Sequence, residues 1–113
     1  NGNHNLFNEI SSLVKKYVGI DQIIDQLILK LGNLKSAYLI GDYAKGIDSG
    51  LVDIVLVGKI NLAILHDIVK KREKEISKKI RPCIFENEES LRKLWGQLEM
   101  DKALLLWGDA IER

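Results

Sequence analysis

The sequence predicts an α/β (α+β) fold in which helices pack on a mixed β-sheet. Two observations lead to this class. Apolar residues recur at helical spacing in four segments, and four other short segments are β-branched or continuously apolar, as buried strands are. Two of the strands flank a glycine-rich turn, and the later strands alternate with helices. With 113 residues, 46% hydrophobic and 29% charged, the chain has the size and composition of one globular domain.

The first half of the chain is predicted to form two helices and then two strands. Residues 6–18 carry an apolar stripe at helical spacing, and a second stripe begins after Asp21, which can cap the helix that it precedes. The segment SAYLI at 36–40 is an apolar run ending in Gly41, and VDIVLVG at 52–58 is a β-branched run with one charge.

The second half is predicted to alternate between helix and strand. Asn61 can cap a third helix that extends to about residue 76, and KIRPCIF at 79–85 reads as a strand. Pro82 has no amide donor, which places this strand at a sheet edge. Asn87 opens a fourth helix, expected to carry Leu91, Leu94, Trp95 and Leu98, and ALLLW at 103–107 is the last strand.

Charge and cysteine content exclude several classes of function. The formal net charge is +1, so no bulk field attracts nucleic acid or an anionic membrane, and no apolar run approaches the ~20 residues of a bilayer span. The single cysteine, Cys83, fits a core residue in a reducing compartment, so we expect a cytoplasmic protein with no membrane partner. His4 and His66 lack a second ligand at zinc spacing. The chain begins with Asn1, and Met100 is its only methionine, so we expect a fragment of a longer protein.

The stretch GDYAKGIDSGLVDIVLVG, residues 41–58, is the candidate site. A turn at 41–46 exposes backbone amides that suit a phosphate, and Asp53 lies just inside the following strand. Side chains alternate along a strand, so an acid at position 55 would join Asp53 in holding a divalent metal, but that residue is Val55. Spacing alone favours a plain hairpin in which Asp53 serves the turn and Val55 the core.

The same stretch resembles the signature of the nucleotidyltransferase superfamily of the DNA polymerase beta type. That signature runs Gly-Ser-Tyr-Ala-Arg-Gly and then, after a gap, Ser-Asp-Ile-Asp-Leu. The matching residues are Gly41, Tyr43, Ala44, Gly46, Asp53, Ile54 and Leu56, with Lys45 in place of arginine. The flanking segments look like the branch in which such a domain follows an ArsR-type winged helix in a transcriptional regulator.

The resemblance implies a domain plan and a set of site residues. It makes residues 1–113 a single nucleotidyltransferase-like domain, with a helical lead-in at 5–32, the signature at 36–58 and a DNA-binding domain upstream. The residues implied to bind a nucleotide are Gly41, Asp42, Tyr43, Lys45 and Gly46. Asp53 is the metal candidate, and it is catalytic only if the domain is active. No cofactor is expected otherwise; an active domain would use Mg²⁺ and a nucleoside triphosphate.

Three departures from the signature indicate a catalytically degraded site. Asp42 replaces the phosphate-binding serine and puts an anion where an anion should bind, a repulsion of about 1 kcal/mol at ~4 Å in water. Val55 replaces the second metal-binding aspartate. The strand expected to supply a third carboxylate has Arg81, Cys83 and Phe85 on one face, and no acid occurs before Glu86.

The replacement of serine by Asp42 raises a structural hypothesis. The Asp42 carboxylate would turn back onto the amides of residues 43–45 and fill the phosphate site itself, as an N-cap does. The competing interpretation is that Asp42 faces solvent.

The leading functional prediction is a sensing or dimerisation module of a transcriptional regulator, without transferase activity. It would form a homodimer and contact DNA only through the winged-helix domain missing upstream, with Trp95 and Trp107 as core or interface anchors. The first alternative is an active Mg²⁺-dependent nucleotidyltransferase, with Asp42 and Asp53 as its metal pair. The second is an antitoxin-like minimal nucleotidyltransferase paired with a helical partner protein.

Overall fold

The computed structural model describes residues 20–31 and 33–111. The predicted helix at 6–18 lies outside them. The helices are α2 (Ile20–Leu31), α3 (Leu62–Ile76) and α4 (Glu88–Lys93), and two short 3₁₀ helices are η1 (Tyr43–Lys45) and η2 (Met100–Lys102). The strands are β1 (Leu34–Ile40), β2 (Leu51–Gly58), β3 (Lys79–Phe85) and β4 (Leu104–Gly108). Each predicted strand is present, so the order of elements along the described chain follows the sequence pattern.

The four strands form one mixed sheet in the order β3-β2-β1-β4. Strand β1 runs antiparallel to both β2 and β4, and β2 runs parallel to β3. The predicted class, a mixed sheet with helices packed on it, is therefore confirmed. Strand β3 lies at an edge, as the missing amide donor of Pro82 predicted.

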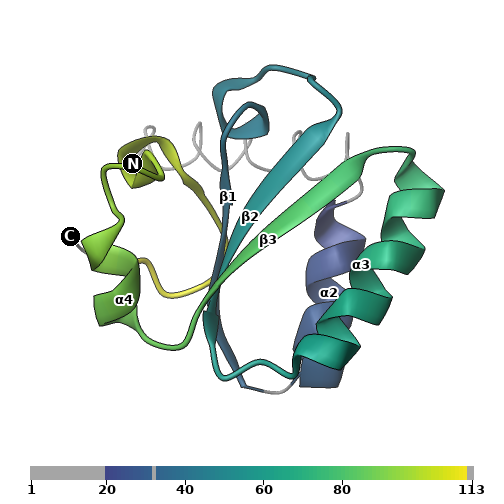
Figure 1. The fold of residues 1–113 in the computed structure, drawn as a ribbon, viewed down its shortest axis with the longest axis horizontal. Helices are drawn as coiled ribbons and strands as arrows, with labels where there is room; N and C mark the ends of the chain where they lie inside the picture. Colours follow the sequence, from purple (N-terminus) through teal and green to yellow (C-terminus); the bar gives the residue numbers. More distant parts are fainter. Residues whose placement is uncertain (1–19, 32, 112–113) are drawn as a thin grey trace, which may run out of the picture.

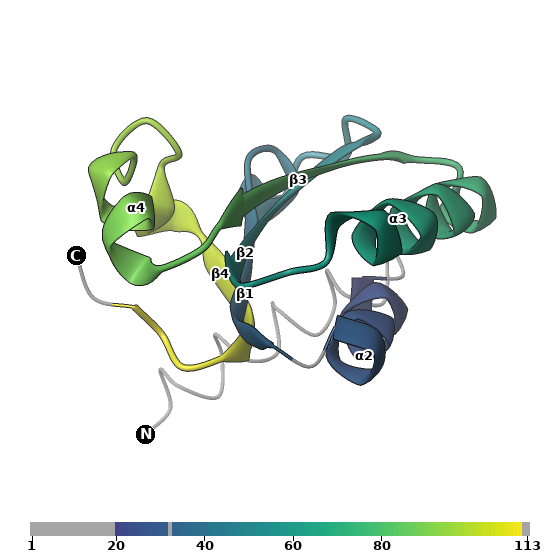
Figure 2. The same cartoon turned by 60° about the horizontal axis from the view of Figure 1, so that its bottom comes forward.

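Helices α2 and α3 cover one face of the sheet, and α4 covers the other (Figures 1 and 2). Under α2 and α3 the strands contribute every second side chain to an apolar layer, which we call the α2/α3 core. Its buried members are Ile23, Ile24, Leu27, Leu34, Ala37, Leu39, Tyr43, Val52, Ile54, Leu56, Leu65, Ile68, Val69, Ile80, Leu104 and Leu106.

The opposite face carries a smaller apolar layer, which we call the α4 core. The alternate residues of β1 and β2 reach it, together with α4 and the segment around η2. Its buried members are Tyr38, Ile40, Val55, Val57, Leu91, Trp95, Met100 and Ile111, with Cys83 and Phe85 packed against them. Residue 53 has the same strand parity as 55 and 57, so the candidate site belongs to this face.

The predicted caps open α3 and α4, but α4 is shorter than expected. The Asn61 side chain accepts hydrogen bonds from the amides of Ala63 (3.0 Å) and Ile64 (3.2 Å), and Asn87 accepts from Ser90 (2.9 Å). Helix α4 ends at Lys93, and the next amides bond to carbonyls three residues back. The prediction that one helix carries Leu94 to Leu98 was wrong, because Trp95 turns inward and its Nε1 donates to Asp101 (3.0 Å).

Within the residues that the structure describes, none of the helices combines the length and the apolar character that a bilayer-spanning helix needs.

Candidate functional site

Residues 41–46, which we call the signature turn, follow β1 and lead towards β2. The turn is closed mainly by its own backbone. Gly41 (φ 72°) and Gly46 (φ 81°) adopt left-handed conformations at its two ends, where glycine is favoured. Between them, the carbonyl of Asp42 accepts hydrogen bonds from the amides of Lys45 (3.0 Å) and Ile47 (2.8 Å). The predicted helical turn at YAKG is present as η1.

The hypothesis that Asp42 fills the phosphate site with its own carboxylate was wrong. Its side chain makes no capping hydrogen bond to η1. The reason lies in its backbone, which is right-handed helical (φ −60°, ψ −45°), whereas a side-chain N-cap requires an extended conformation. Asp42 is half-buried, so it is not a fully solvated surface acid either.

Tyr43 is buried and holds the loop that follows the turn. Its hydroxyl donates a hydrogen bond to the Asp48 carboxylate and accepts one from the Gly50 amide (3.0 Å). Lys78 completes the group, with Nζ 3.4 Å from Asp48 and 5.9 Å from the centre of the Tyr43 ring. Both hydrogen-bonding roles of the hydroxyl are used inside the protein, so Tyr43 here stabilises the loop. Its partners Asp48 and Lys78 were not predicted from sequence.

Asp53 is engaged by an arginine of the neighbouring strand. The register of β2 with β3 places Arg81 directly opposite Asp53. The guanidinium makes a two-pronged contact, Nε to Oδ1 at 2.7 Å and Nη2 to Oδ2 at 3.1 Å. The Asp53 side chain is 17% exposed and that of Arg81 is 57% exposed, so the carboxylate is covered and the guanidinium lies over it. This hydrogen bonding to Asp53 raises the pKa of Arg81 further above its already high value.

The backbone of the signature turn lies close to the same carboxylate. A Cβ placed on Gly41 would lie 2.7 Å from Oδ2 of Asp53. Glycine is therefore required at position 41 for two independent reasons, its positive φ and the closeness of Asp53. Gly41 therefore lies close to Asp53, and Arg81 binds both oxygens of its carboxylate.

Lys45, which stands where the signature has arginine, is also engaged. Its Nζ lies 3.1 Å from both carboxylate oxygens of Glu99, in the segment between α4 and η2. Lys102 approaches the same carboxylate at 3.6 Å. The hydrogen bond from Lys45 lowers the pKa of Glu99 below its ordinary value. The contact joins the signature turn to a segment 54 residues further along the chain.

The residues at this site do not fit a catalytic magnesium ion. Both oxygens of Asp53 accept from Arg81, and Val55, on the same face of β2, is fully buried in the α4 core. In the described part of the chain no three His, Cys, Asp or Glu residues are grouped so that they could hold a metal. Glu86, the first acid after β3, and Asp109, the acid after β4, are both exposed.

Cys83 lies two residues beyond Arg81 on β3 and is half-buried against the α4 core. Burial raises the pKa of its thiol, with a further contribution from the charge of Asp53. A thiol whose pKa is raised is a poor nucleophile at neutral pH, in agreement with the predicted role as a small core residue.

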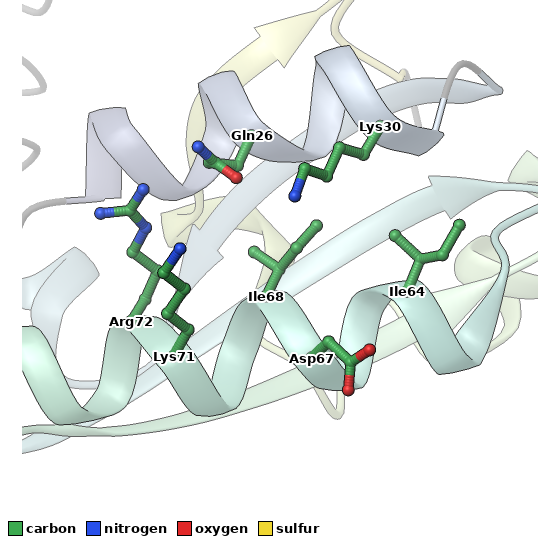
Figure 3. A pocket seen from close by; sticks show the side chains of 7 residues that line it. All are labelled: Gln26, Lys30, Ile64, Asp67, Ile68, Lys71 and Arg72. Carbon is green, nitrogen blue, oxygen red and sulfur yellow. The ribbon is translucent and has the colours of Figure 1, made fainter.

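A groove of about 400 Å³ lies between α2 and α3, on the face opposite the candidate site. Figure 3 shows Gln26 and Lys30 extending from α2 towards α3, whose residues Ile64 and Ile68 form the apolar part of the groove. The groove contains none of the residues of the signature turn. It is therefore separate from the predicted nucleotide site.

No family model and no curated protein sequence matches the chain. Solved structures do. A chain from a mutant of the toxin–antitoxin complex MntA–HpeT is 21% identical, with a TM-score of 0.59 over 78% of this chain and 71% of that one. A chain from the Shewanella oneidensis complex of a tri-AMPylated HEPN toxin with the MNT antitoxin is 17% identical, with a TM-score of 0.55 over 78% and 68%.

A third similar structure is a protein from Sulfolobus solfataricus assigned as a nucleotidyltransferase. It is 18% identical, with a TM-score of 0.53 over 90% of this chain and 86% of that one. The chain therefore has a nucleotidyltransferase-like fold, as the signature predicted. These similarities are to antitoxin complexes and to a nucleotidyltransferase, and they give no support to the predicted role in a transcriptional regulator.

Proposed function

We propose that this chain acts by binding a second protein, in the manner of an antitoxin, and that it transfers no nucleotide. The likeness in fold to chains from toxin–antitoxin complexes supports the first part. The contacts of Asp53 support the second. The proposal corresponds to the antitoxin-like alternative predicted from sequence, combined with the predicted loss of catalysis.

The ion pair between Arg81 and Asp53 is the observation that carries the proposal. Two-metal nucleotidyl transfer needs divalent ions on both the attacking and the leaving oxygens. The carboxylate that would hold such an ion is engaged by a guanidinium at 2.7 and 3.1 Å, and a buried valine occupies the second position. Magnesium is usually bound by one or two carboxylates together with substrate phosphates. Here the carboxylate of Asp53 is already bound by Arg81.

The nucleotide-binding role of Gly41, Asp42, Tyr43, Lys45 and Gly46 stays a prediction. The contacts around them argue for a structural use of the turn. Tyr43 and Lys45 are bonded to Asp48 and Glu99, and the Asp42 carbonyl closes the backbone. We propose that the turn keeps the shape of a nucleotide site while its polar groups stabilise the fold, so that partner binding depends on neither nucleotide nor metal.

The partner that we propose is a toxin-like protein that is inactive while it is held in the complex. The test is to co-express the chain with the product of the adjoining gene and measure three quantities. These are bacterial growth, complex formation by size-exclusion chromatography with light scattering, and transfer of label from α-labelled ATP in the presence of Mg²⁺ or Mn²⁺. We expect growth rescue and a complex, with no label on either protein.

The variants Asp53→Asn and Arg81→Gln separate binding from chemistry, with Arg92→Gln as the matched control. Arg92 makes an exposed ion pair with Glu88 on α4 at 3.2 Å and lies outside the turn. All three variants should still rescue growth. Label transfer that disappears in Asp53→Asn would show an active enzyme, and the absence of both complex and rescue would exclude the antitoxin-like role.

A further inference from the structure

We infer that Arg81 is the resident cation of this site. Its guanidinium takes the oxygens of Asp53 that a divalent ion would need, so the arginine and a metal exclude each other. The consequence is a latent cation site, closed in the protein as it stands and opened by removing one side chain. The inference concerns the isolated chain, so it holds whether or not the proposed partner exists.

The geometry of the contact is the first step. A two-pronged arginine–carboxylate pair engages both oxygens of the acid in fixed directions. Nε and Nη2 of Arg81 are donors to Oδ1 and Oδ2 of Asp53, at 2.7 and 3.1 Å. A metal ion on this carboxylate would have to displace at least one of these donors. The positively charged guanidinium would still lie beside it.

The second step is the position that the backbone gives to Asp53. Its place in β2 is fixed by Ile40 of β1 on one side and by Arg81 of β3 on the other. Gly41 approaches Oδ2 so closely that an added Cβ would lie 2.7 Å from it. The carboxylate therefore lies beside the signature turn, and the strand register supplies its cation as a side chain.

The third step is a second carboxylate that acts on the same guanidinium. After the hydrogen bond and charge of Asp53, the charge of Asp42 also raises the pKa of Arg81. The hydrogen-bonding contact is with Asp53, and Asp42 contributes only through its charge. Removing the positive charge would leave the Asp53 carboxylate to bind one divalent ion weakly.

The exposed fractions distinguish this arrangement from an ordinary surface ion pair. In a surface pair both side chains are solvated, and breaking it leaves two hydrated groups that attract nothing in particular. Asp53 is only 17% exposed, and Arg81 is part of what covers it, so removing this side chain would open the carboxylate to solvent. A cation from solution would then take the place of the side chain.

The experiment measures Mn²⁺ binding to the 113-residue chain by electron paramagnetic resonance and by calorimetry, without nucleotide. The proteins are the wild type and the variants Arg81→Lys, Arg81→Gln and Arg81→Asp. Arg92→Gln is the matched control, since it too removes an exposed arginine that pairs with a carboxylate, that of Glu88. Circular dichroism confirms that each variant is folded, and the neutral and acidic replacements provide two independent chances to observe the site.

We expect no Mn²⁺ binding at millimolar concentration in the wild type, Arg81→Lys or Arg92→Gln. Arg81→Gln should bind Mn²⁺, and Arg81→Asp should bind it about tenfold more tightly because it adds a ligand. Adding Asp53→Asn should abolish both gains. Three outcomes would each overturn the inference. The wild type could bind Mn²⁺ through Asp53, neither Arg81→Gln nor Arg81→Asp could gain Mn²⁺ binding, or Arg92→Gln could gain it equally. Loss of partner binding alone would leave it unaffected and would count only against the proposed function.

Discussion

The two faces of the sheet are built in different ways. The α2/α3 core is a layer of apolar side chains from two long helices and alternate strand positions. The α4 core is smaller, and specific polar contacts border it. The Tyr38 hydroxyl accepts from the Ile111 amide, Trp95 donates to Asp101, and Asp53 pairs with Arg81.

The difference separates the source of stability from the place where function can change. Apolar packing is non-directional, and the α2/α3 core alone has sixteen buried members, so its stabilisation of the sheet does not depend on any single contact on the other side. The contacts around the α4 core are pairwise, and two of them join residues that are 28 and 73 positions apart. A substitution such as an arginine at position 81 can therefore alter the site while the fold remains.

The largest expected effect comes from the α2/α3 core. Leu27 of α2 has no exposed surface, and Leu27→Ala removes its packing and leaves a cavity. The free energy of unfolding should fall by about 3–5 kcal/mol, a large share of the stability of a small domain. Urea denaturation followed by circular dichroism measures the loss.

Leu29→Ala is the control within the same helix. Leu29 is 80% exposed, so its truncation should change stability by less than about 0.5 kcal/mol. Equal losses in the two variants would contradict the assignment of α2 to this face of the sheet.

The next effect tests the contact between the signature turn and Asp53. Gly41→Ala combines a positive φ, which costs alanine about 1–2 kcal/mol, with a Cβ placed 2.7 Å from Oδ2. We expect a total loss of about 2–4 kcal/mol, since overpacking adds to the backbone strain. Thermal and urea unfolding both report it.

Gly46→Ala isolates the strain from the clash. Gly46 also has a positive φ (81°), but a Cβ there would meet nothing within 4 Å. Gly46→Ala should therefore lower the free energy of unfolding less than Gly41→Ala does, because only the conformational strain contributes. In an Asp53→Ala background, the difference in lost stability between Gly41→Ala and Gly46→Ala should shrink. An unchanged difference would show that the added Cβ at position 41 does not contact Asp53.

The α2/α3 core could be predicted from sequence because periodicity determines it. Alternating residues in VDIVLVG and the stripe after Asp21 specify which side chains are buried, and the structure places them so. The caps Asn61 and Asn87 were likewise local signals. The end of α4 could not be predicted, because the tertiary contact of Trp95 with Asp101 competes with local helix propensity.

The site was predictable only in part. The absence of a second carboxylate at Val55 and the parity of Arg81 on its strand were both visible in the sequence. That Arg81 lies opposite Asp53 depends on the parallel register of β2 and β3, which no local pattern specifies. The pairing of Lys45 with Glu99 is a long-range contact of the same kind. Residue types indicated what the site lacks, and only the register shows what replaced it.

A third prediction tests the polar contacts around the α4 core. Tyr38→Phe removes the hydroxyl that accepts a hydrogen bond from the Ile111 amide, and both residues are buried. A buried amide without a partner should cost about 1–2 kcal/mol, which urea unfolding can measure. Burial raises the pKa of Tyr38, because it favours the neutral phenol in the folded chain. The resulting stabilisation is present below the ordinary pKa of 10.0 and is lost as the pH rises through the raised pKa. If Tyr38→Phe leaves the free energy of unfolding unchanged, the C-terminal segment does not depend on this hydrogen bond.

The smallest effect concerns the contact that ties the signature turn to η2. The hydrogen bond and charge of Lys45 lower the pKa of Glu99, so the folded chain releases this proton more readily than the unfolded chain does. The resulting stabilisation is present above the ordinary value of 4.5 and is lost as the pH falls through the lowered pKa. Glu99→Gln should therefore be slightly less stable than the wild type at pH 7 and equally stable at the acidic end of the titration. Because the pair is exposed, salt should reduce the difference. A difference that persists at low pH and high salt would assign Glu99 a packing role, and the turn would then be held to the α4 side of the sheet by shape instead of charge.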